Sequence, residues 1–383
     1  MESTIVPIEI PRRPATYSIT IGDGELRRVG EWAATALGRN SGRILIVSNR
    51  KVFGLYGDCV VSNLSKTGFE THVELIGDGE RFKNLRTLEK TLRALSENAF
   101  TRSDAVVALG GGVVGDLAGF AASVHLRGID LLQIPTTLLS MIDSSVGGKT
   151  GVNTAFGKNL VGSFYQPAGV LIDVATLKTL PRREVTAGFC EAIKQGAISG
   201  RPLFDQTARV LDSRRSTAAL SSADASGDLI ALIAEQLKFK AKIVQNDESE
   251  SVASISPRSR KILNFGHTFA HALEKVTDYR RFKHGEAVGY GIMFAAELSK
   301  KLELLGQDEV DSLNDVVRRA GTLPALAGID QSGILKSFKY DKKQVGNSLH
   351  WVLLRDFGKP VIVPDTEIPR SALLSTLETI FQK

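Results

Sequence analysis

Histidines and a carboxylate in the second half of the chain have the residue types and the spacing of a metal site. His267 and His271 stand four residues apart in the run Asn264-Phe-Gly-His-Thr-Phe-Ala-His271, so on a helix they share one face. His284 follows 17 residues after His267. Glu191 is the best candidate for the carboxylate. Histidines with a carboxylate form a common catalytic zinc set that leaves one position open for substrate.

Each part of this set also has a structural interpretation. The two closely spaced histidines could cap a helix or fill a core, and Glu191 with Lys194 could form an ordinary i,i+3 ion pair on a helix surface. Position 268 is Thr, so the chain lacks the general base of the His-Glu-x-x-His metalloproteases. The spacing alone therefore leaves a metal site and a structural role both open.

A glycine-rich run after a hydrophobic segment provides a second chemical signal. In Ala105-Val-Val-Ala-Leu-Gly-Gly-Gly-Val-Val-Gly-Asp116, Gly110, Gly112 and Gly115 fit the pattern Gly-x-Gly-x-x-Gly ahead of a predicted helix over 113–124. Glycine lets the backbone approach a pyrophosphate, and a helix N-terminus favours its negative charge. A dinucleotide or phosphate site and a plain tight turn are both compatible with this run alone.

Two further glycine-rich segments follow, and we expect both to be loops. They are Asp143-Ser-Ser-Val-Gly-Gly-Lys-Thr150 and Gly157-Lys-Asn-Leu-Val-Gly162. Lys149 and Lys158 in these segments suit phosphate as point charges, although a surface lysine is more often simply solvated. Gly148-Lys149-Thr150 resembles the end of a P-loop, but the first P-loop glycine would fall on Asp143, which excludes that ATPase motif.

The first half of the chain alternates apolar segments with helical patterns. Near-continuous apolar runs are typical of a parallel sheet covered on both faces, and a helical pattern fills residues 85–97. The expected strands lie at 17–21, 43–48, 71–76, 104–109, 130–134 and 170–174. This alternation predicts an α/β fold with a Rossmann-like parallel sheet, and we expect a nucleotide-binding domain over residues 1–180.

The second half, residues 181–383, has mostly helical patterns. The expected helices lie at 184–198, 229–244, 262–276, 286–302, 308–320 and 369–381, with a strand pair near 349–354 and 361–363. Residues 247–259 are rich in serine and predict a surface loop. Cys190 has no nucleophile's neighbours and is expected to be a buried apolar residue. We expect a metal- and substrate-binding domain here, with the site in the cleft between the halves.

Bulk composition excludes several classes of protein. The net charge is +6, from 48 Lys and Arg against 42 Asp and Glu, and the basic residues form no long stripe, so we expect an anionic small substrate and no nucleic acid. No apolar run approaches the ~20 residues that cross a bilayer, so no membrane partner is expected. Two cysteines and the absence of a secretory signal favour the cytoplasm.

Taken together, these motifs resemble the 3-dehydroquinate synthases, which belong to the sugar-phosphate cyclase superfamily. The resemblance extends over most of the chain, roughly from residue 44 to residue 354. The matching segments, besides the glycine-rich ones above, are Gly110–Gly119, Gln133–Leu138, Tyr165–Pro167, Thr179–Pro181, Asn264–His267 and Asp341–Lys343.

The resemblance implies an activity and its cofactors. Members convert 3-deoxy-D-arabino-heptulosonate 7-phosphate to 3-dehydroquinate and phosphate, in the shikimate pathway, which leads to chorismate and the aromatic amino acids. They use NAD and a divalent metal, usually zinc and in some cases cobalt. The reaction combines a transient oxidation, phosphate elimination, re-reduction, ring opening and an intramolecular aldol closure. Members are typically cytoplasmic homodimers.

The resemblance also implies the site residues. The metal ligands would be Glu191, His267 and His284, which moves His271 to the substrate phosphate. Lys149, Lys342 and Arg127 would also serve the phosphate, with Arg127 reaching a neighbouring subunit's site. Lys240 and Arg260 would hold the carboxylate, and further substrate contacts would be Asp143, Lys194 and Asn264. NAD contacts would be Asn49, Glu80, Lys83, Gly111, Gly112, Val113, Asp116, Thr136, Thr137, Lys149, Lys158, Asn159, Thr179, Leu180 and Glu184.

Two other enzyme classes stay as alternatives. Other sugar-phosphate cyclases share NAD and metal, and include aminodehydroquinate-type enzymes and those that act on sedoheptulose 7-phosphate. The latter substrate has no carboxylate for Lys240 and Arg260 to bind. Metal-dependent alcohol dehydrogenases share a similar triple-glycine loop, but they would release NADH and would not be expected to carry the lysine-containing segments at 149 and 158.

Overall fold

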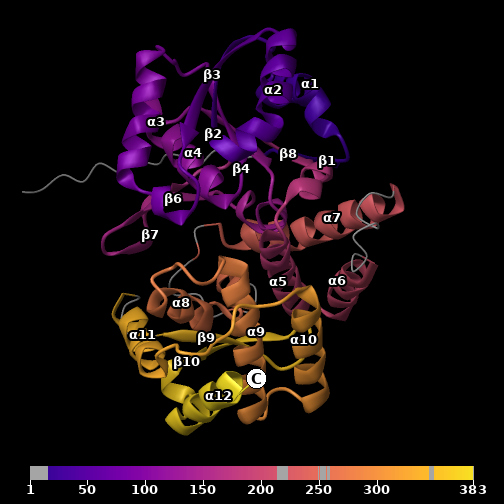
Figure 1. Ribbon diagram of the computed structural model, residues 1–383, viewed down its shortest axis with the longest axis vertical. Coiled ribbons are helices and arrows are strands. Elements are labelled where there is room, and N and C mark those ends of the chain that lie inside the picture. Colours follow the sequence, from indigo (N-terminus) through magenta and orange to yellow (C-terminus); the bar gives the residue numbers. More distant parts are fainter. Residues whose placement is uncertain are drawn as a thin grey trace, which may run out of the picture.

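A parallel sheet of six strands forms the centre of the first half (Figure 1). The computed structural model describes residues 16–213, 223–248, 250, 256, 259–344 and 349–382. The strands lie in the order β1-β8-β5-β4-β2-β3. Their bounds are β1 Ser18–Gly22, β2 Gly42–Asn49, β3 Phe69–Ile76, β4 Ala105–Gly110, β5 Asp130–Pro135 and β8 Gly169–Asp173. All six predicted strands are therefore present, within two residues at each end.

Helices cover both faces of this sheet because its strands are apolar on both faces. They are α1 Val29–Leu37, α2 Arg50–Thr67, α3 Leu85–Glu97 and α4 Gly112–Val124. In β4, Val106 and Ala108 pack with α3 and α4, whereas Val107 and Leu109 pack with α1 and α2. The order of strands reverses between β2 and β4, so the glycine-rich turn after β4 lies at the switch point, where such sheets bind their ligands.

The sequence predicts two glycine-rich loops, at 143–150 and 157–162, but a β-hairpin includes the end of the first segment and all of the second. Strand β6 Lys149–Thr154 pairs antiparallel with β7 Gly157–Phe164. The prediction of loops was wrong for most of these residues. Glycines permit this pairing, because a Cβ on Gly162 would lie 2.1 Å from the backbone oxygen of Thr150 on the other strand. The hairpin packs on α4, where a Cβ on Gly119 would meet Thr150.

The second half is helical, with one small antiparallel sheet. The helices are α5 Arg182–Ser199, α6 Arg201–Ser213, α7 Ala223–Asn246, α8 His267–Val276, α9 His284–Lys301, α10 Gln307–Ala320, α11 Gln331–Gln344 and α12 Arg370–Gln382. Strand β9 His350–Leu354 pairs with β10 Pro360–Pro364. This confirms the predicted fold class of a parallel α/β sheet followed by a mostly helical part.

One predicted helix is interrupted. The sequence predicts a single helix over 262–276, but the structure has a 3₁₀ turn at Arg260–Asn264 and then α8 from His267. Gly266 between them has a φ of 77°, in the left-handed region that glycine tolerates. This break places His267 at the first turn of α8. Most of the predicted surface loop over 247–259 lies outside the residues that the structure describes.

The largest hydrophobic core joins the two halves. It includes Met141 and Ile172 from the first half together with Phe189, Ile193 and Phe269 from the second. Every residue of α5 from Thr186 to Ile198 is buried, including Cys190, as predicted. Helices α5 and α7 lie at the boundary between the halves (Figure 1). Among the described helices, none is both long and apolar enough for a membrane span.

Candidate active site

A carboxylate and two imidazoles from three different helices meet at the boundary between the halves. Glu191 lies in α5, His267 begins α8 and His284 begins α9. Glu191 Oε1 lies 3.6 Å from His267 Nε2 and 3.5 Å from His284 Nε2. These three side chains form one of two groups, within the described part of the chain, whose geometry would allow a shared metal ion.

Glycines bring the three helices close enough for this meeting. A Cβ on Gly285, directly after His284, would lie 2.0 Å from the backbone oxygen of Ala187, one turn before Glu191. A Cβ on Gly291 in α9 would likewise lie 2.0 Å from the backbone oxygen of Gly266, which precedes His267. Since only glycine permits such close backbone contact, α9 is fixed against both α5 and the start of α8.

Both imidazoles are oriented so that Nε2 faces the carboxylate. His267 Nδ1 lies 3.2 Å from the backbone oxygen of Phe265, and His284 Nδ1 lies 3.2 Å from a carboxylate oxygen of Glu274. We assign the ring proton of each histidine to Nδ1, because both of these neighbours only accept hydrogen bonds. In the neutral form of each ring, Nε2 then carries a free lone pair, which is the arrangement of metal-bound histidine.

The carboxylate of Glu191 has the surroundings of a metal ligand. It is fully buried, and neither of its oxygens accepts a hydrogen bond with good geometry from a described residue. Lys194 Nζ forms an ion pair with Glu191 Oε2 over 2.6 Å, and both side chains are buried. The alternative that the sequence left open, an ion pair on a helix surface, is therefore wrong. Although burial disfavours its charge, Glu191 and Asp143 hold the pKa of Lys194 above its usual value. Burial and Lys194 hold the pKa of His267 well below its usual range, so this imidazole is neutral and available to a cation.

Glu274 is a member of this site that we did not predict. It is 3% exposed, and its other carboxylate oxygen lies 3.0 Å from Lys158 Nζ of the hairpin. Burial alone would raise the pKa of Glu274, but His284 and Lys158 hold it well below its usual range. A signal was available in the sequence, since Glu274 follows His267 by seven residues and so shares its helix face.

A second charged cluster surrounds Asp143. This residue lies in a π-helical turn, Ser140–Ser144, an irregularity that is frequent at functional sites. Lys240 Nζ lies 2.8 Å from Asp143 Oδ1 and also donates to its backbone oxygen, and Gln195 Nε2 donates to Oδ1 over 3.1 Å. Despite burial, Lys240 and Lys194 hold the pKa of Asp143 far below its usual range. The cluster therefore keeps an ionised carboxylate among cations, and Gln195 is another residue that we did not predict.

A third cluster lies at the base of the hairpin. Lys149 donates to a carboxylate oxygen of Glu250, whose other oxygen accepts from Asn264 Nδ2 over 3.2 Å. Arg260 is 2% exposed, and its Nη1 donates to the backbone oxygens of Gly147 and Glu248. The structure thus brings Lys149, Arg260 and Asn264 together around one acidic side chain, Glu250.

Most of the residues expected to contact NAD follow the carboxyl ends of neighbouring strands. Lys83 is 4% exposed and donates to Asp116 and, over 2.5 Å, to Asn159 Oδ1. Glu80 Oε1 accepts from Asn153 of the hairpin over 2.7 Å. Lys149 and Lys158 lie in the hairpin, and the others lie at the end of β2 (Asn49), at the start of α4 (Gly111, Gly112, Val113), after β5 (Thr136, Thr137) and after β8 (Thr179, Leu180, Glu184).

Some expected residues already have partners within the protein, and two are not part of the clusters above. Asn49 accepts from Val52 N and so caps α2, and Glu184 pairs with Lys283 over 2.6 Å. Arg127 is exposed in the 3₁₀ turn before β5. The side chain of Lys342, in α11, lies outside the part of the chain whose side chains the structure describes.

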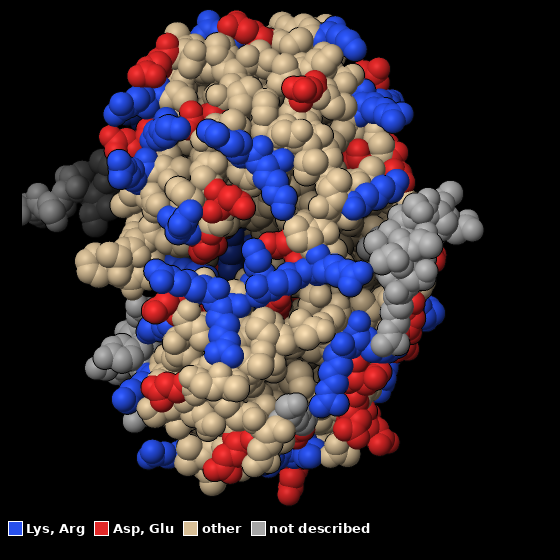
Figure 2. All heavy atoms as spheres, in the orientation of Figure 1, with Lys and Arg blue, Asp and Glu red and all other residues tan. Residues whose placement is uncertain are grey.

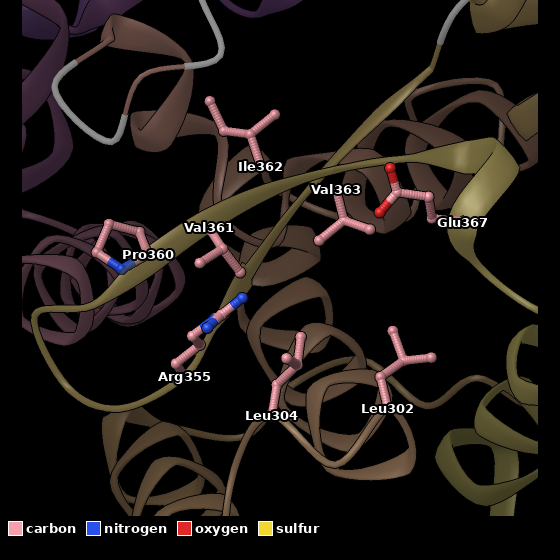
Figure 3. A pocket seen from close by; sticks show the side chains of 8 residues that line it. All are labelled: Leu302, Leu304, Arg355, Pro360, Val361, Ile362, Val363 and Glu367. Atoms are coloured by element: carbon pink, nitrogen blue, oxygen red, sulfur yellow. The ribbon is translucent and has the colours of Figure 1, made fainter.

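Basic side chains gather around a hollow between the two halves (Figure 2). A pocket on the first half lies at the ends of β2 and β3, and it is lined by Arg50, Lys51, Leu75, Ile76, Gly77 and Asp78. Another pocket, of about 430 Å³, lies apart from these clusters between β10 and the end of α9 (Figure 3). Its lining is mostly aliphatic, with one Arg and one Glu: Leu302, Leu304, Arg355, Pro360, Val361, Ile362, Val363 and Glu367.

Comparisons with known proteins agree with this architecture. The N-terminal family model of 3-dehydroquinate synthase matches residues 73–187, and the C-terminal model matches residues 188–344. A 3-dehydroquinate synthase from Rippkaea orientalis is 41% identical over 382 residues, which cover 97% of this chain and 98% of that protein. The chain belongs to the 3-dehydroquinate synthase family. This confirms the resemblance on which the expected site rests.

Solved structures of two other synthases share the fold of this chain. A 2-epi-5-epi-valiolone synthase from Streptomyces hygroscopicus, with NAD+ and Zn2+ bound, has a TM-score of 0.85 at 25% identity and covers 98% of this chain and 99% of its own. A 2-deoxy-scyllo-inosose synthase, complexed with carbaglucose-6-phosphate, NAD+ and Co2+, has a TM-score of 0.78 at 25% identity and covers 95% and 96%.

Proposed function

We propose that this chain is a 3-dehydroquinate synthase, a carbon–oxygen lyase that converts 3-deoxy-D-arabino-heptulosonate 7-phosphate to 3-dehydroquinate and phosphate. One observation carries this proposal besides family membership. The buried Glu191 carboxylate faces the Nε2 atoms of His267 and His284, and both imidazoles have Nδ1 occupied by an acceptor. This donor set fits a divalent metal with an open coordination position, and we propose zinc, with cobalt as a substitute.

The cofactors supply the redox and Lewis-acid chemistry: a bound metal lowers the pKa of a coordinated hydroxyl, and NAD accepts and returns a hydride. The chain's own residues hold the substrate in place for these steps. Lys194 stays charged beside Glu191, and we propose that it binds a substrate hydroxyl next to the metal. This division of work requires few general bases, because positioning and charge stabilisation contribute most of the rate.

The basic clusters suit a substrate with two anionic groups. We propose that Lys149 and His271, with Lys342 and a neighbouring subunit's Arg127, bind the phosphate, and that Asn264 is a further substrate contact. Lys240 and Arg260 would bind the carboxylate, with Asp143 holding Lys240 in place over 2.8 Å. In the structure Lys149 forms an ion pair with Glu250. The substrate phosphate would replace the Glu250 carboxylate as the anionic partner of Lys149.

The carboxyl edge of the sheet suits a dinucleotide. We propose that NAD lies along this edge, with its pyrophosphate at the start of α4 beside Gly111, Gly112 and Val113. The adenosine end would lie near Asn49, Glu80 and Lys83, next to the pocket at the ends of β2 and β3. The nicotinamide end would extend past Asp116, Thr136, Thr137, Lys158, Asn159, Thr179, Leu180 and Glu184 toward the metal.

The proposal includes the organisation of the protein. We divide the chain into a nucleotide-binding domain over residues 1–180 and a metal- and substrate-binding domain over residues 181–383. We further propose that the protein acts in the cytoplasm as a homodimer, within the shikimate pathway.

The test is phosphate release from 3-deoxy-D-arabino-heptulosonate 7-phosphate with catalytic amounts of NAD and zinc. Sedoheptulose 7-phosphate serves as the comparison substrate, because it lacks the carboxylate. We expect release from the first substrate alone, without net formation of NADH. Release from the second substrate alone would show another sugar-phosphate cyclase, and accumulation of NADH would show an alcohol dehydrogenase.

A further inference from the structure

The buried carboxylate of Glu274 connects the proposed metal site with the hairpin of the first half. Its Oε2 lies 3.2 Å from Nδ1 of His284, and its Oε1 lies 3.0 Å from Nζ of Lys158. Lys158 also lies 4.1 Å from the centre of the Tyr279 ring, so its ammonium group is held from two sides by the helical half. Both oxygens of Glu274 therefore have a cationic or donor partner.

Glu274 belongs to the second group of side chains that could hold a metal, together with His271 and His284. Two observations argue against a ligand role for it. His284 already presents Nε2 to Glu191 and Nδ1 to Glu274, and one imidazole offers a single lone pair when its other nitrogen is protonated. In addition, the Lys158 ammonium beside Glu274 Oε1 would repel a second cation at that place.

We propose that Glu274 is a positioning residue that acts on the metal through His284. Its carboxylate accepts a hydrogen bond from the Nδ1–H group, which fixes the tautomer and the ring orientation of His284 and makes Nε2 a stronger donor toward the metal. Lys158 holds the carboxylate from the opposite side, so Glu274 stays in place before the metal arrives. This inference rests on the proposed metal site at Glu191, His267 and His284.

The first experiment measures zinc affinity in metal-free, substrate-free protein by competition with a chromophoric chelator. The variant Glu274→Gln keeps the shape of the side chain but removes its charge, and we expect zinc affinity to fall about 10- to 100-fold. Glu297→Gln is the matched control, because Glu297 is also buried, in α9, and forms an ion pair with Lys300. We expect the control to bind zinc within about twofold of the wild type.

Further variants separate positioning from direct ligation. Glu191→Gln removes a proposed ligand, so it should weaken zinc binding more than Glu274→Gln does. Lys158→Met leaves the hydrogen bond between Glu274 and His284 in place, so it should change zinc affinity less than Glu274→Gln. The visible absorption of the cobalt-substituted protein should shift in Glu274→Gln, since the orientation of His284 changes, while it stays unchanged in Glu297→Gln.

Each contrary outcome has its own meaning. Wild-type zinc affinity and an unchanged cobalt spectrum in Glu274→Gln would overturn the positioning role alone. A larger loss in Glu274→Gln than in Glu191→Gln would make Glu274 a ligand and overturn the inference in another way. A wild-type protein that binds no zinc would overturn the metal assignment on which the inference and the proposed function both depend.

Discussion

Replacing Gly285 by alanine tests how tightly the backbone positions the proposed metal ligands. The new Cβ would lie 2.0 Å from the backbone oxygen of Ala187 and 2.5 Å from its carbonyl carbon. Ordinary contact begins near 3.4 Å, so α9 and α5 must separate by about 1.4 Å at this point. Backbone atoms cannot rotate away as a side chain does. We therefore expect a loss of about 1–3 kcal/mol in the free energy of unfolding, the usual cost of overpacking.

The same displacement affects the site. Gly285 adjoins His284, so a rigid shift of α9 would lengthen the 3.5 Å distance between His284 Nε2 and Glu191 Oε1 by up to about 1.4 Å. We expect weaker zinc binding as well as lower stability, measured by chelator competition and by urea unfolding.

A matched control comes from Gly54, which lies exposed in α2, where a Cβ would have no other atom within 4 Å. Gly54→Ala should stabilise the protein by about 0.4–1 kcal/mol, because alanine has less conformational freedom to lose on folding. If Gly285→Ala were as stable as Gly54→Ala and bound zinc like the wild type, the reasoning from backbone contact would be refuted.

Three other substitutions test the site and the fold. His267→Ala should abolish metal-dependent turnover and leave the thermal unfolding midpoint largely intact; normal activity with unchanged metal content would contradict the metal assignment. Lys240→Met should destabilise the protein by about 2 kcal/mol, because it leaves the partly enclosed Asp143 without its closest cation. The double variant with Asp143→Asn should recover part of that loss in urea unfolding, and no recovery would argue against the pair. Asp104 accepts from the backbone nitrogens of Arg43 and Thr101, and these bonds hold its pKa below the usual value despite burial. Its contribution is therefore present above about pH 4 and lost as the pH falls further, so Asp104→Asn should cost about 1–3 kcal/mol at pH 7 and less in acid. An equal cost at both pH values would contradict this account.

The strands of the first half were predictable because burial on both faces leaves nearly continuous apolar runs, as in Val106–Leu109. The hairpin of β6 and β7 was not predictable in this way. Apolar and polar residues do not alternate regularly along either strand, and the residues include several glycines and polar side chains that also suit loops. The break at Gly266 was missed because the apolar pattern continues on both sides of it, and only the backbone shows the positive φ.

The site was only partly predictable, since its members come from distant parts of the sequence. Spacing within one helix related His267 to His271, but nothing local related either of them to Glu191, which lies 76 residues before His267. The resemblance to a known family implied His284 as the third ligand. The contact of Glu274 with His284 depends on how α8 packs against α9, and this packing follows from glycine positions that no periodicity reveals.

The hydrophobic core that joins the two halves limits how such a protein can be recombined. If the halves met only at a hinge, a nucleotide-binding half from one relative could be grafted onto the catalytic half of another. Here Met141 and Ile142 share a core with Phe189 and Ile193, so a graft would place unmatched side chains against each other. A functional chimera must therefore carry the turn around Asp143 together with its partners on α5, so the junction cannot be placed between that turn and α5.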